Sequence, residues 1–125
     1  MLSVTKKFSF CYGHHLPDYV GLCKNFHGHN ANVEVEFSEA ATRNDTYPGM
    51  VVDFHEIKNV VSPLLVFLDH QYLNEVLPEP YLPPTAEHIT SWLRDKILET
   101  PLGNGLVRVR VSETDNAYAE WRKDA

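Results

Sequence analysis

Regular alternation of apolar and polar side chains in residues 27–39 is the feature that most constrains how this chain can fold. One parity carries His27, His29, Ala31, Val33, Val35 and Phe37. The other parity carries Glu34 and Glu36. Successive side chains of a β-strand point to opposite faces, so this period of two predicts a strand with one face in a core and the other in water.

A second segment, residues 4–15, has the same period. Its shared parity carries Phe8, Phe10, Tyr12 and His14. A loop over residues 17–25 lies between the two segments, and a short connection allows neighbouring strands to pair antiparallel. We therefore expect a long antiparallel pair joined by this loop.

Two helices are expected in the middle of the chain. The first begins at Asp53, after a turn within residues 42–49, and Pro63 is expected to kink or restart it. The second has clearer signals, because Thr85 can cap its N-terminus and Pro101 follows its end. Its apolar stripe consists of Ile89, Trp92, Leu93 and Ile97.

The last part of the chain returns to the strand pattern. Valines alternate with polar residues over 107–112, and residues 117–123 can turn back as an edge strand. The order is ββααββ, which predicts an α+β fold. With 125 residues, 43% of them hydrophobic, the chain is expected to form one domain over residues 1–125.

Composition argues against several classes of function. A net charge of −6 with no basic stripe argues against nucleic-acid binding. The N-terminus lacks the apolar h-region of a signal peptide, and no stretch approaches the roughly 20 apolar residues of a membrane span. We expect a cytoplasmic protein with no membrane partner, whose two cysteines, Cys11 and Cys23, are thiols.

Three histidines form a candidate zinc site. His27 and His29 lie at i and i+2, so a strand presents both imidazoles on one face. His14 ends the neighbouring strand on its core-facing parity and can converge on the same point, whereas His15 points the other way. Three imidazoles would leave one tetrahedral position of Zn²⁺ open, as catalytic zinc sites do. The alternative is that the three histidines bind no metal and are polar surface residues or hydrogen-bonded core residues.

Cys23 lies four residues before His27, in the loop expected to cover the metal. Its thiol has three interpretations: a small buried hydrophobe, a fourth zinc ligand that closes the site, or a base or nucleophile activated by the nearby dication. Residue types and spacing do not separate the last two.

Two short motifs follow the strand pair. Asp69 precedes His70 and can orient its imidazole, as the acid of a catalytic triad does, although the pair also fits a polar turn between helices. Glu87 follows Thr85 in the first turn of the second helix, where the helix dipole favours any acid. Capping is a sufficient explanation for both Thr85 and Glu87.

Glu113 ends a core-facing row of valines with a carboxylate. A buried acid needs a partner, and a guanidine-like ring edge of a ligand is a good one. The alternative is an ion pair with Arg108, Arg110 or Arg122.

Several motifs occur in a characteristic order along the chain: Phe8-Ser9-Phe10, His14, Cys23-x-x-x-His27-Gly28-His29, Val52-Asp53-Phe54, Leu68-Asp69-His70, Pro84-Thr85-x-Glu87 and Ser112-Glu113-Thr114. Together they resemble the 6-pyruvoyltetrahydropterin and 6-carboxytetrahydropterin synthases. The resemblance implies the tunnelling fold, an antiparallel four-stranded sheet with two helices on one face. It also implies that trimers form a barrel and pair into a homohexamer.

The resemblance implies a role for each residue of the histidine motif. His14, His27 and His29 would hold Zn²⁺. Cys23 would be a catalytic thiol rather than a fourth zinc ligand. Sites in this family lie between subunits, so the catalytic groups need not come from one chain.

The remaining motifs also receive roles from the resemblance. Asp69 and His70 would complete a proton-relay triad with the catalytic thiol. Glu113 would anchor the amino-pyrimidine edge of a dihydropterin triphosphate, and Thr85 and Glu87 would line the pocket.

The chain departs from the family pattern at Cys11, Tyr12 and Gly13, where an acid and small alanines are common. The interval from Cys23 to His27 is shorter than in the animal pyruvoyl-forming enzymes and matches the carboxy-forming ones. The resemblance therefore implies a zinc-dependent lyase that converts 7,8-dihydroneopterin triphosphate to 6-carboxy-5,6,7,8-tetrahydropterin, acetaldehyde and triphosphate. That product leads toward 7-deazaguanine compounds such as queuosine.

Two alternatives stay open. A 6-pyruvoyltetrahydropterin synthase would eliminate triphosphate without releasing acetaldehyde. A non-catalytic zinc-stabilised oligomerisation module would need the histidines but not Cys23, His70 or Glu113. A relative that acts as an aldolase toward folate precursors is disfavoured because position 23 is a cysteine.

Overall fold

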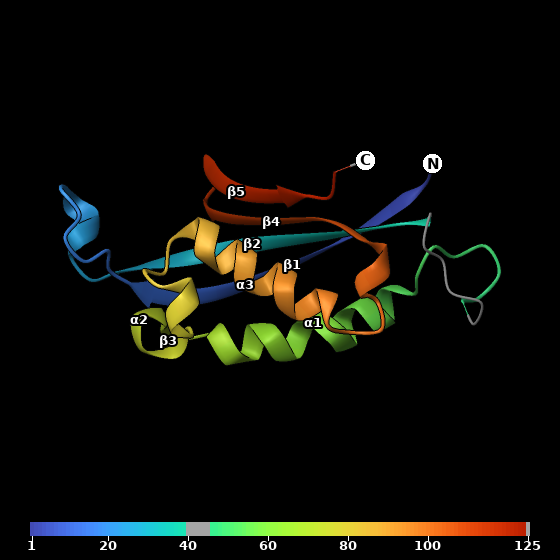
Figure 1. Ribbon diagram of the computed structural model, residues 1–125, viewed down its shortest axis with the longest axis horizontal. Helices are drawn as coiled ribbons and strands as arrows, with labels where there is room; N and C mark the ends of the chain where they lie inside the picture. Colours follow the sequence, from blue (N-terminus) through green and yellow to red (C-terminus); the bar gives the residue numbers. More distant parts are fainter. Residues whose placement is uncertain (40–45, 125) are drawn as a thin grey trace.

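The computed structural model describes residues 1–39 and 46–124, so part of the turn predicted within residues 42–49 lies outside the described residues. The chain forms β1 (Ser3–His14), β2 (His27–Ser38), α1 (Phe54–Leu68), β3 (Gln71–Tyr72), α2 (Leu73–Val76), α3 (Ala86–Leu98), β4 (Leu106–Thr114) and β5 (Ala117–Arg122) (Figure 1). Short 3₁₀ turns cover Leu22–Lys24, Glu79–Tyr81 and Gly103–Gly105. The predicted ββααββ order is confirmed, with β3 and α2 inserted between the two long helices.

The strands form one sheet in the order β3-β1-β2-β4-β5. β1 and β2 are antiparallel along their whole length, and His14 lies opposite His27. The sheet has five strands rather than the expected four, because Gln71 and Tyr72 add a short parallel strand beside β1. Two residues are too few to show a period, so the sequence carries no signal for this strand.

Helices α1 and α3 lie on one face of the sheet (Figure 1). α1 begins where predicted, because the Asp53 side chain accepts a hydrogen bond from the His55 N–H at 2.8 Å. The helix continues through Pro63, so that residue does not restart it. The Thr85 hydroxyl caps α3 as predicted, accepting from the His88 N–H at 3.1 Å.

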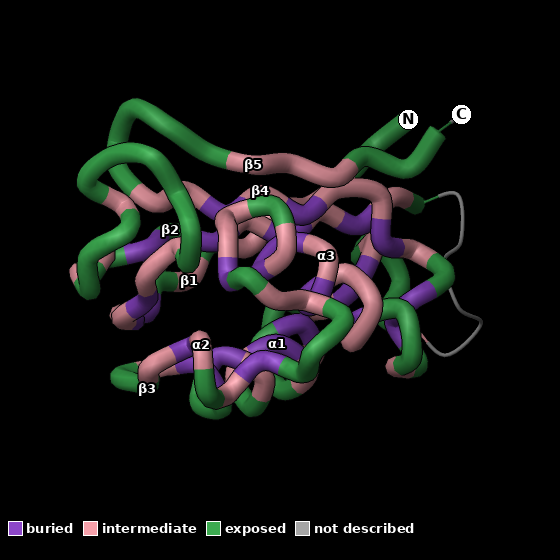
Figure 2. Tube along the Cα trace, turned by 60° about the vertical axis from the view of Figure 1, so that its left-hand side comes forward, coloured by how far each residue is buried: buried purple, intermediate pink, exposed green. Residues whose placement is uncertain are grey.

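The core fills the space between the helices and the inner face of the sheet (Figure 2). The alternation predicted for residues 27–39 is confirmed, because Ala31, Val33 and Val35 are fully buried while Asn30 and Asn32 are exposed. The α3 stripe is buried as predicted and consists of Ile89, Trp92, Leu93 and Ile97. Each buried aliphatic side chain stabilises the fold by about 1.5–3 kcal/mol, so this layer holds the strand register in place.

The outer face of the sheet carries a charged network around Arg108. Its guanidinium contacts Glu36 at 2.7 Å, and Glu34 and Glu120 at 3.2 Å each. Glu120 also contacts Arg110 at 2.7 Å. These residues have the opposite parity to the buried valines of β4, so the network lies on the face that the helices leave uncovered.

Candidate metal centre

Three imidazoles converge at one end of the β1–β2 pair. The strand register sets His14 opposite His27 and Tyr12 opposite His29, so these histidines share one face. One ligand nitrogen from each of His14, His27 and His29 lies within 4.8 Å of the others. The structure therefore brings together the three histidines that the sequence predicts. His15 lies outside this group, and its ring nitrogen Nδ1 bonds with the Tyr72 hydroxyl.

Backbone carbonyls orient two of these imidazoles. His14 Nδ1 lies 2.7 Å from the Pro84 carbonyl oxygen, and His27 Nδ1 lies 2.7 Å from the Asn25 carbonyl oxygen. A carbonyl oxygen can only accept, so both Nδ1 atoms carry the hydrogen and both Nε2 atoms of the neutral rings present lone pairs. Those Nε2 atoms are 2.8 Å apart. Two lone pairs at that distance repel each other unless a proton or a metal ion lies between them, and a set of three imidazole nitrogens fits a metal ion.

Burial supports the ligand form of His14. This residue is only 2% exposed. Burial lowers the pKa of the His14 imidazole, against the raising effect of the Pro84 carbonyl, and the neighbouring His27 lowers it further. The neutral imidazole is the form that binds metals, so the local environment favours ligation over protonation.

Glu113 lies beside the histidines rather than beside an arginine. Its Oε1 atom is 3.9 Å from Nε2 of both His14 and His29. The Tyr12 hydroxyl donates to the same oxygen at 3.3 Å. Burial of Tyr12, followed by the charge of Glu113, raises the pKa of the Tyr12 hydroxyl and keeps it protonated as a donor.

The alternative partners considered for Glu113 bind elsewhere. The guanidinium groups of the three arginines pair with other glutamates on the outer face, in a set formed by Arg108, Arg110, Arg122, Glu34, Glu36 and Glu120. The ion-pair interpretation of Glu113 is therefore wrong. Arginines that alternate with buried valines necessarily face away from the side on which Glu113 meets the histidines.

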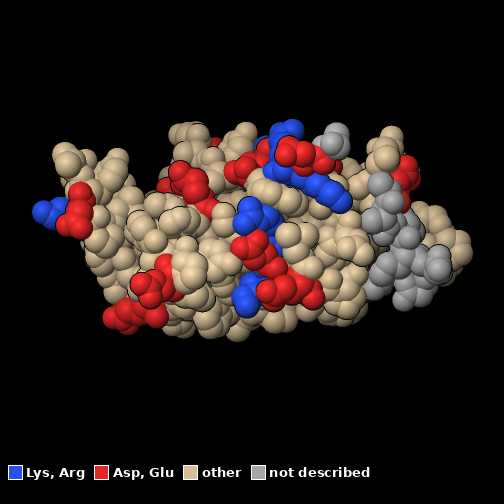
Figure 3. Space-filling view, viewed as in Figure 1, with Lys and Arg blue, Asp and Glu red and all other residues tan. Residues whose placement is uncertain are grey.

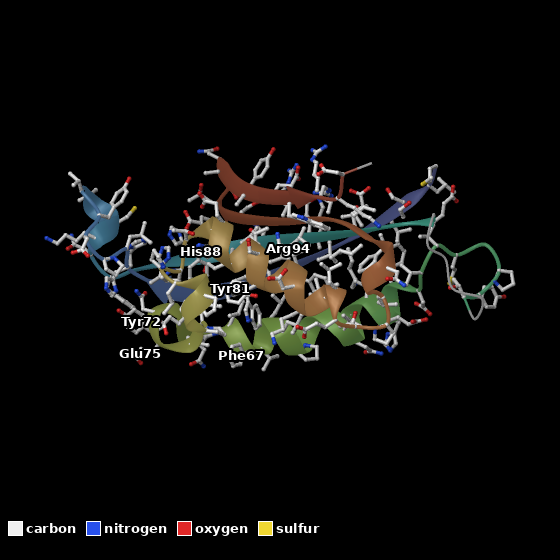
Figure 4. The ribbon with its side chains drawn as sticks, in the orientation of Figure 1. Phe67, Tyr72, Glu75, Tyr81, His88 and Arg94 are labelled. Atoms are coloured by element: carbon white, nitrogen blue, oxygen red, sulfur yellow. The ribbon has the colours of Figure 1, made fainter. Side chains whose placement is uncertain are left out.

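A cavity of about 450 Å³ lies between α3 and the C-terminal strands, and both Glu87 and Glu113 line it. Thr85, which the resemblance placed in the pocket wall, is not part of this lining, and its hydroxyl caps α3. Arg94 and Trp121 also line the cavity, and the Arg94 guanidinium lies 5.8 Å from the centre of the Trp121 ring. Figure 4 shows Arg94 on the side of α3 that is turned toward β4 and β5. Sequence reasoning missed these two residues, since neither stands in a recognisable motif.

The Asp69–His70 pair has the geometry of an oriented imidazole. His70 Nδ1 lies 2.8 Å from Asp69 Oδ2, so Nε2 is the nitrogen left for a ligand or a proton. Asp69 follows the last residue of α1 and accepts from the Cys11 N–H at 2.9 Å. That hydrogen bond, and next the bond from His70, lower the pKa of Asp69 and hold it as a carboxylate. The pair lies in the turn between α1 and β3, and its hydrogen bonds with Cys11 hold that turn against β1.

Cys23 lies in the 3₁₀ turn Leu22–Lys24, in a loop that extends beyond the ends of β1 and β2 (Figure 1). Its carbonyl accepts from the Leu16 N–H at 2.7 Å, which ties the loop to the chain just after His14. Cys23 is not a member of the three-histidine group. Within one chain, the thiol that lies with Asp69 and His70 is that of Cys11. The catalytic role of Cys23 stays a prediction.

The surface shows no broad basic field on the face seen in Figure 3, where lysine and arginine side chains lie among acidic ones. This agrees with the net charge of −6. Within residues 1–39 and 46–124, no helix is both long enough and apolar enough to cross a bilayer.

Comparison with known proteins extends over almost the whole chain. The 6-carboxy-5,6,7,8-tetrahydropterin synthase of Synechocystis is 36% identical over 123 residues, which cover 97% of this chain and 93% of that protein. The 6-pyruvoyl tetrahydrobiopterin synthase of Drosophila melanogaster is 29% identical over 97% of this chain and 78% of its own length.

Solved structures agree on the fold. The 6-pyruvoyl tetrahydropterin synthase of Caenorhabditis elegans superposes with a TM-score of 0.82 at 23% identity, covering 98% of this chain and 96% of that one. The expected tunnelling fold is confirmed by this likeness. The family model of 6-pyruvoyl tetrahydropterin synthase matches residues 3–124, and the chain therefore belongs to that family.

Proposed function

We propose that this protein is a zinc-dependent lyase that converts 7,8-dihydroneopterin triphosphate to 6-carboxy-5,6,7,8-tetrahydropterin, acetaldehyde and triphosphate. The observation that carries the proposal is the cluster of His14, His27 and His29, whose ligand nitrogens meet beside the Glu113 carboxylate. A lone structural zinc site would not need an acid and an open cavity next to it. A pterin enzyme needs both.

The histidine cluster would hold the metal with three neutral ligands. Bound Zn²⁺ would act as a Lewis acid toward the hydroxyls of the substrate side chain. The carbonyls of Pro84 and Asn25 keep two of the imidazoles in the required tautomer. No residue of the described chain closes the set to four, which suits a centre that must accept substrate.

The pterin ring would lie in the cavity between α3 and the C-terminal strands. Glu113 would accept hydrogen bonds from the amino-pyrimidine edge, which presents adjacent N–H donors as a guanidinium does. The Tyr12 hydroxyl holds one oxygen of this carboxylate and leaves the other for the ligand. Glu87 lines the same cavity from α3, and Thr85 would act only through its cap on that helix.

Proton transfer would be the task of Cys23, Asp69 and His70. The Asp69 carboxylate orients the His70 imidazole, so that Nε2 can take up and return a proton. Cys23 belongs to the loop between His14 and His27, and within one chain its thiol is not grouped with Asp69 and His70. The relay would therefore be completed between two copies of the chain.

Assembly as a homohexamer of two stacked trimers is part of the proposal. β5 is an edge strand of the sheet, and exposed strand edges in stable proteins are usually covered or paired. Multi-angle light scattering of the purified protein should give six times the mass of one chain. A fully active monomer would contradict both the assembly and the shared relay.

The choice of product rests on the short Cys23-to-His27 interval and on the name of the Synechocystis relative. The name of the Drosophila relative supports the alternative, a 6-pyruvoyl product with no carbon–carbon cleavage. Incubation with 7,8-dihydroneopterin triphosphate should release acetaldehyde in step with triphosphate. Triphosphate with 6-pyruvoyltetrahydropterin and no acetaldehyde would assign the alternative.

The metal is tested separately from the product. His27→Ala should lose bound zinc and turnover together, because it removes one of three ligands. His15→Ala is the matched control, since His15 lies next to the cluster in sequence but outside it in space. Full zinc content in the His27 variant would reject the assigned ligand set.

A further inference from the structure

A second group of possible ligands is separate from the three-histidine group, although His29 lines the same cavity as two of its members. It consists of Cys11, Asp69 and His70, and one ligand atom from each lies within 4.8 Å of the others. Cys11 precedes Tyr12 on β1, and Tyr12 is the residue that faces the histidines. Neighbouring side chains on a strand point to opposite faces, so the Cys11 thiol projects from the other side of the β1–β2 pair. The proposed reaction makes no use of Cys11.

Backbone hydrogen bonds hold this group in place. The Cys11 N–H donates to Asp69 Oδ1 at 2.9 Å, and the His70 N–H donates to the Cys11 carbonyl at 2.6 Å. His70 adopts a left-handed backbone conformation with φ of 58°, which is uncommon for a residue other than glycine. The parallel pairing of Tyr12 with Gln71 continues the attachment. The segments that carry the ligands are therefore fixed before any ion arrives.

The three side chains suit a borderline-soft dication. A thiolate and a carboxylate together balance two positive charges, and the imidazole of His70 adds a neutral nitrogen donor. Zn²⁺ binds sulfur, nitrogen and oxygen ligands of these types at about 2.0–2.3 Å, which sets ligand atoms about 3.3–3.6 Å apart. The His70 side chain is 78% exposed, so its imidazole can rotate to bring the ligand nitrogen to that spacing. Its Nδ1 would bind the ion and exchange the hydrogen bond with Asp69 for the metal, so that both side chains can contact the same ion.

An ion can reach this group from solvent. A cavity of about 500 Å³ lies on this part of the sheet, and Cys11, Asn30 and His70 line it. Tyr72 of β3 also lines this cavity, and its label in Figure 4 shows where the cavity lies. The Asn30 carbonyl oxygen accepts from the Cys11 thiol at 3.0 Å, so the sulfur already points to a polar environment.

We propose that Cys11, Asp69 and His70 form a second site for a divalent cation of the zinc class, distinct from the histidine centre. Binding would displace the thiol proton and leave the Asn30 side chain free to turn toward solvent. A bound ion would also be coordinated by Asp69 and His70. If these residues carry the relay of the proposed function, a second equivalent of zinc inhibits turnover; this consequence rests on that function, whereas the binding itself does not.

Cobalt provides a direct readout, because a Co²⁺–thiolate bond gives a charge-transfer band in the near ultraviolet that nitrogen and oxygen ligands do not give. The assembled wild-type protein, first given one equivalent of Zn²⁺ per chain, is titrated with Co²⁺. The thiolate band should appear and saturate at one further equivalent. Cys11→Ser should abolish it, and His70→Gln should weaken the apparent affinity at least tenfold.

Cys23→Ser is the matched control, because it removes the other thiol and should leave the band unchanged. A band that survives in the Cys11 variant and disappears in the Cys23 variant would overturn the proposal and make Cys23 the thiolate ligand. A wild-type titration with no thiolate band would also overturn it. These spectra do not depend on turnover, so they test the second cation site even if the protein does not catalyse the proposed reaction.

Discussion

Removal of the Tyr12 hydroxyl is the most informative single change at the candidate site. Tyr12 is 3% exposed, and its ring stacks on Phe10 at 5.4 Å and meets His14 edge-on at 5.1 Å. Tyr12→Phe keeps these ring contacts and creates no large cavity. It deletes only the O–H that donates to Glu113 Oε1. The effect can therefore be attributed to that hydrogen bond.

The magnitude follows from the bond's geometry. Hydrogen bonds to a charged partner contribute about 1.5–3 kcal/mol, and the usual O–H···O distance is near 2.7–2.8 Å. The observed distance of 3.3 Å is long, so a loss near the lower limit, about 1–1.5 kcal/mol, is expected. For a chain of 125 residues this lowers the melting temperature by about 3–6 °C. Glu113 also loses the donor that holds one of its oxygens, so pterin affinity should fall by about tenfold.

Urea unfolding of the wild type and the variant, together with a fluorescence titration of a dihydropterin, measures both effects. Tyr118→Phe is the control, because Tyr118 is 55% exposed and should tolerate the change. An unchanged unfolding midpoint for Tyr12→Phe would refute the stabilising role of the bond. A destabilised variant with unchanged pterin affinity would show that Tyr12 does not position Glu113 for the ligand.

Three further changes test other parts of the structure. Burial acts to raise the pKa of Glu120, but hydrogen bonds from Arg122, Arg110 and Arg108 lower it to about 2. Glu120→Gln should therefore cost about 1–2 kcal/mol in urea unfolding above pH 5, and the two proteins should converge as the pH falls toward 2. Thr85→Ala should cost about 1 kcal/mol in thermal unfolding through the lost cap of α3, and Thr85→Ser should restore it. Cys23→Ala should keep zinc and oligomeric mass but lose most turnover; loss of zinc would make Cys23 a ligand instead.

The sequence by itself determined the strand pair and the histidine cluster at its end. The period of two over residues 27–39 excludes a slip by one residue, because such a slip would turn every buried side chain toward water. Once β1 and β2 pair in that register, His14, His27 and His29 must share a face. The caps at Asp53 and Thr85 could likewise be predicted, since capping depends on residues within a few positions of each other.

Tertiary structure decided which of the remaining polar groups meet. Glu113 could have joined an arginine or the histidines, and the pairing of β4 with β2 placed it beside His14 and His29. The sequence has no signal for β3, yet its pairing with β1 brings Asp69 and His70 to Cys11, 58 positions away from Asp69 along the chain. Local patterns in the sequence predict which side chains of a segment face the core. Contacts between distant segments depend on how the helices return the chain to the sheet, and only the packed structure contains that information.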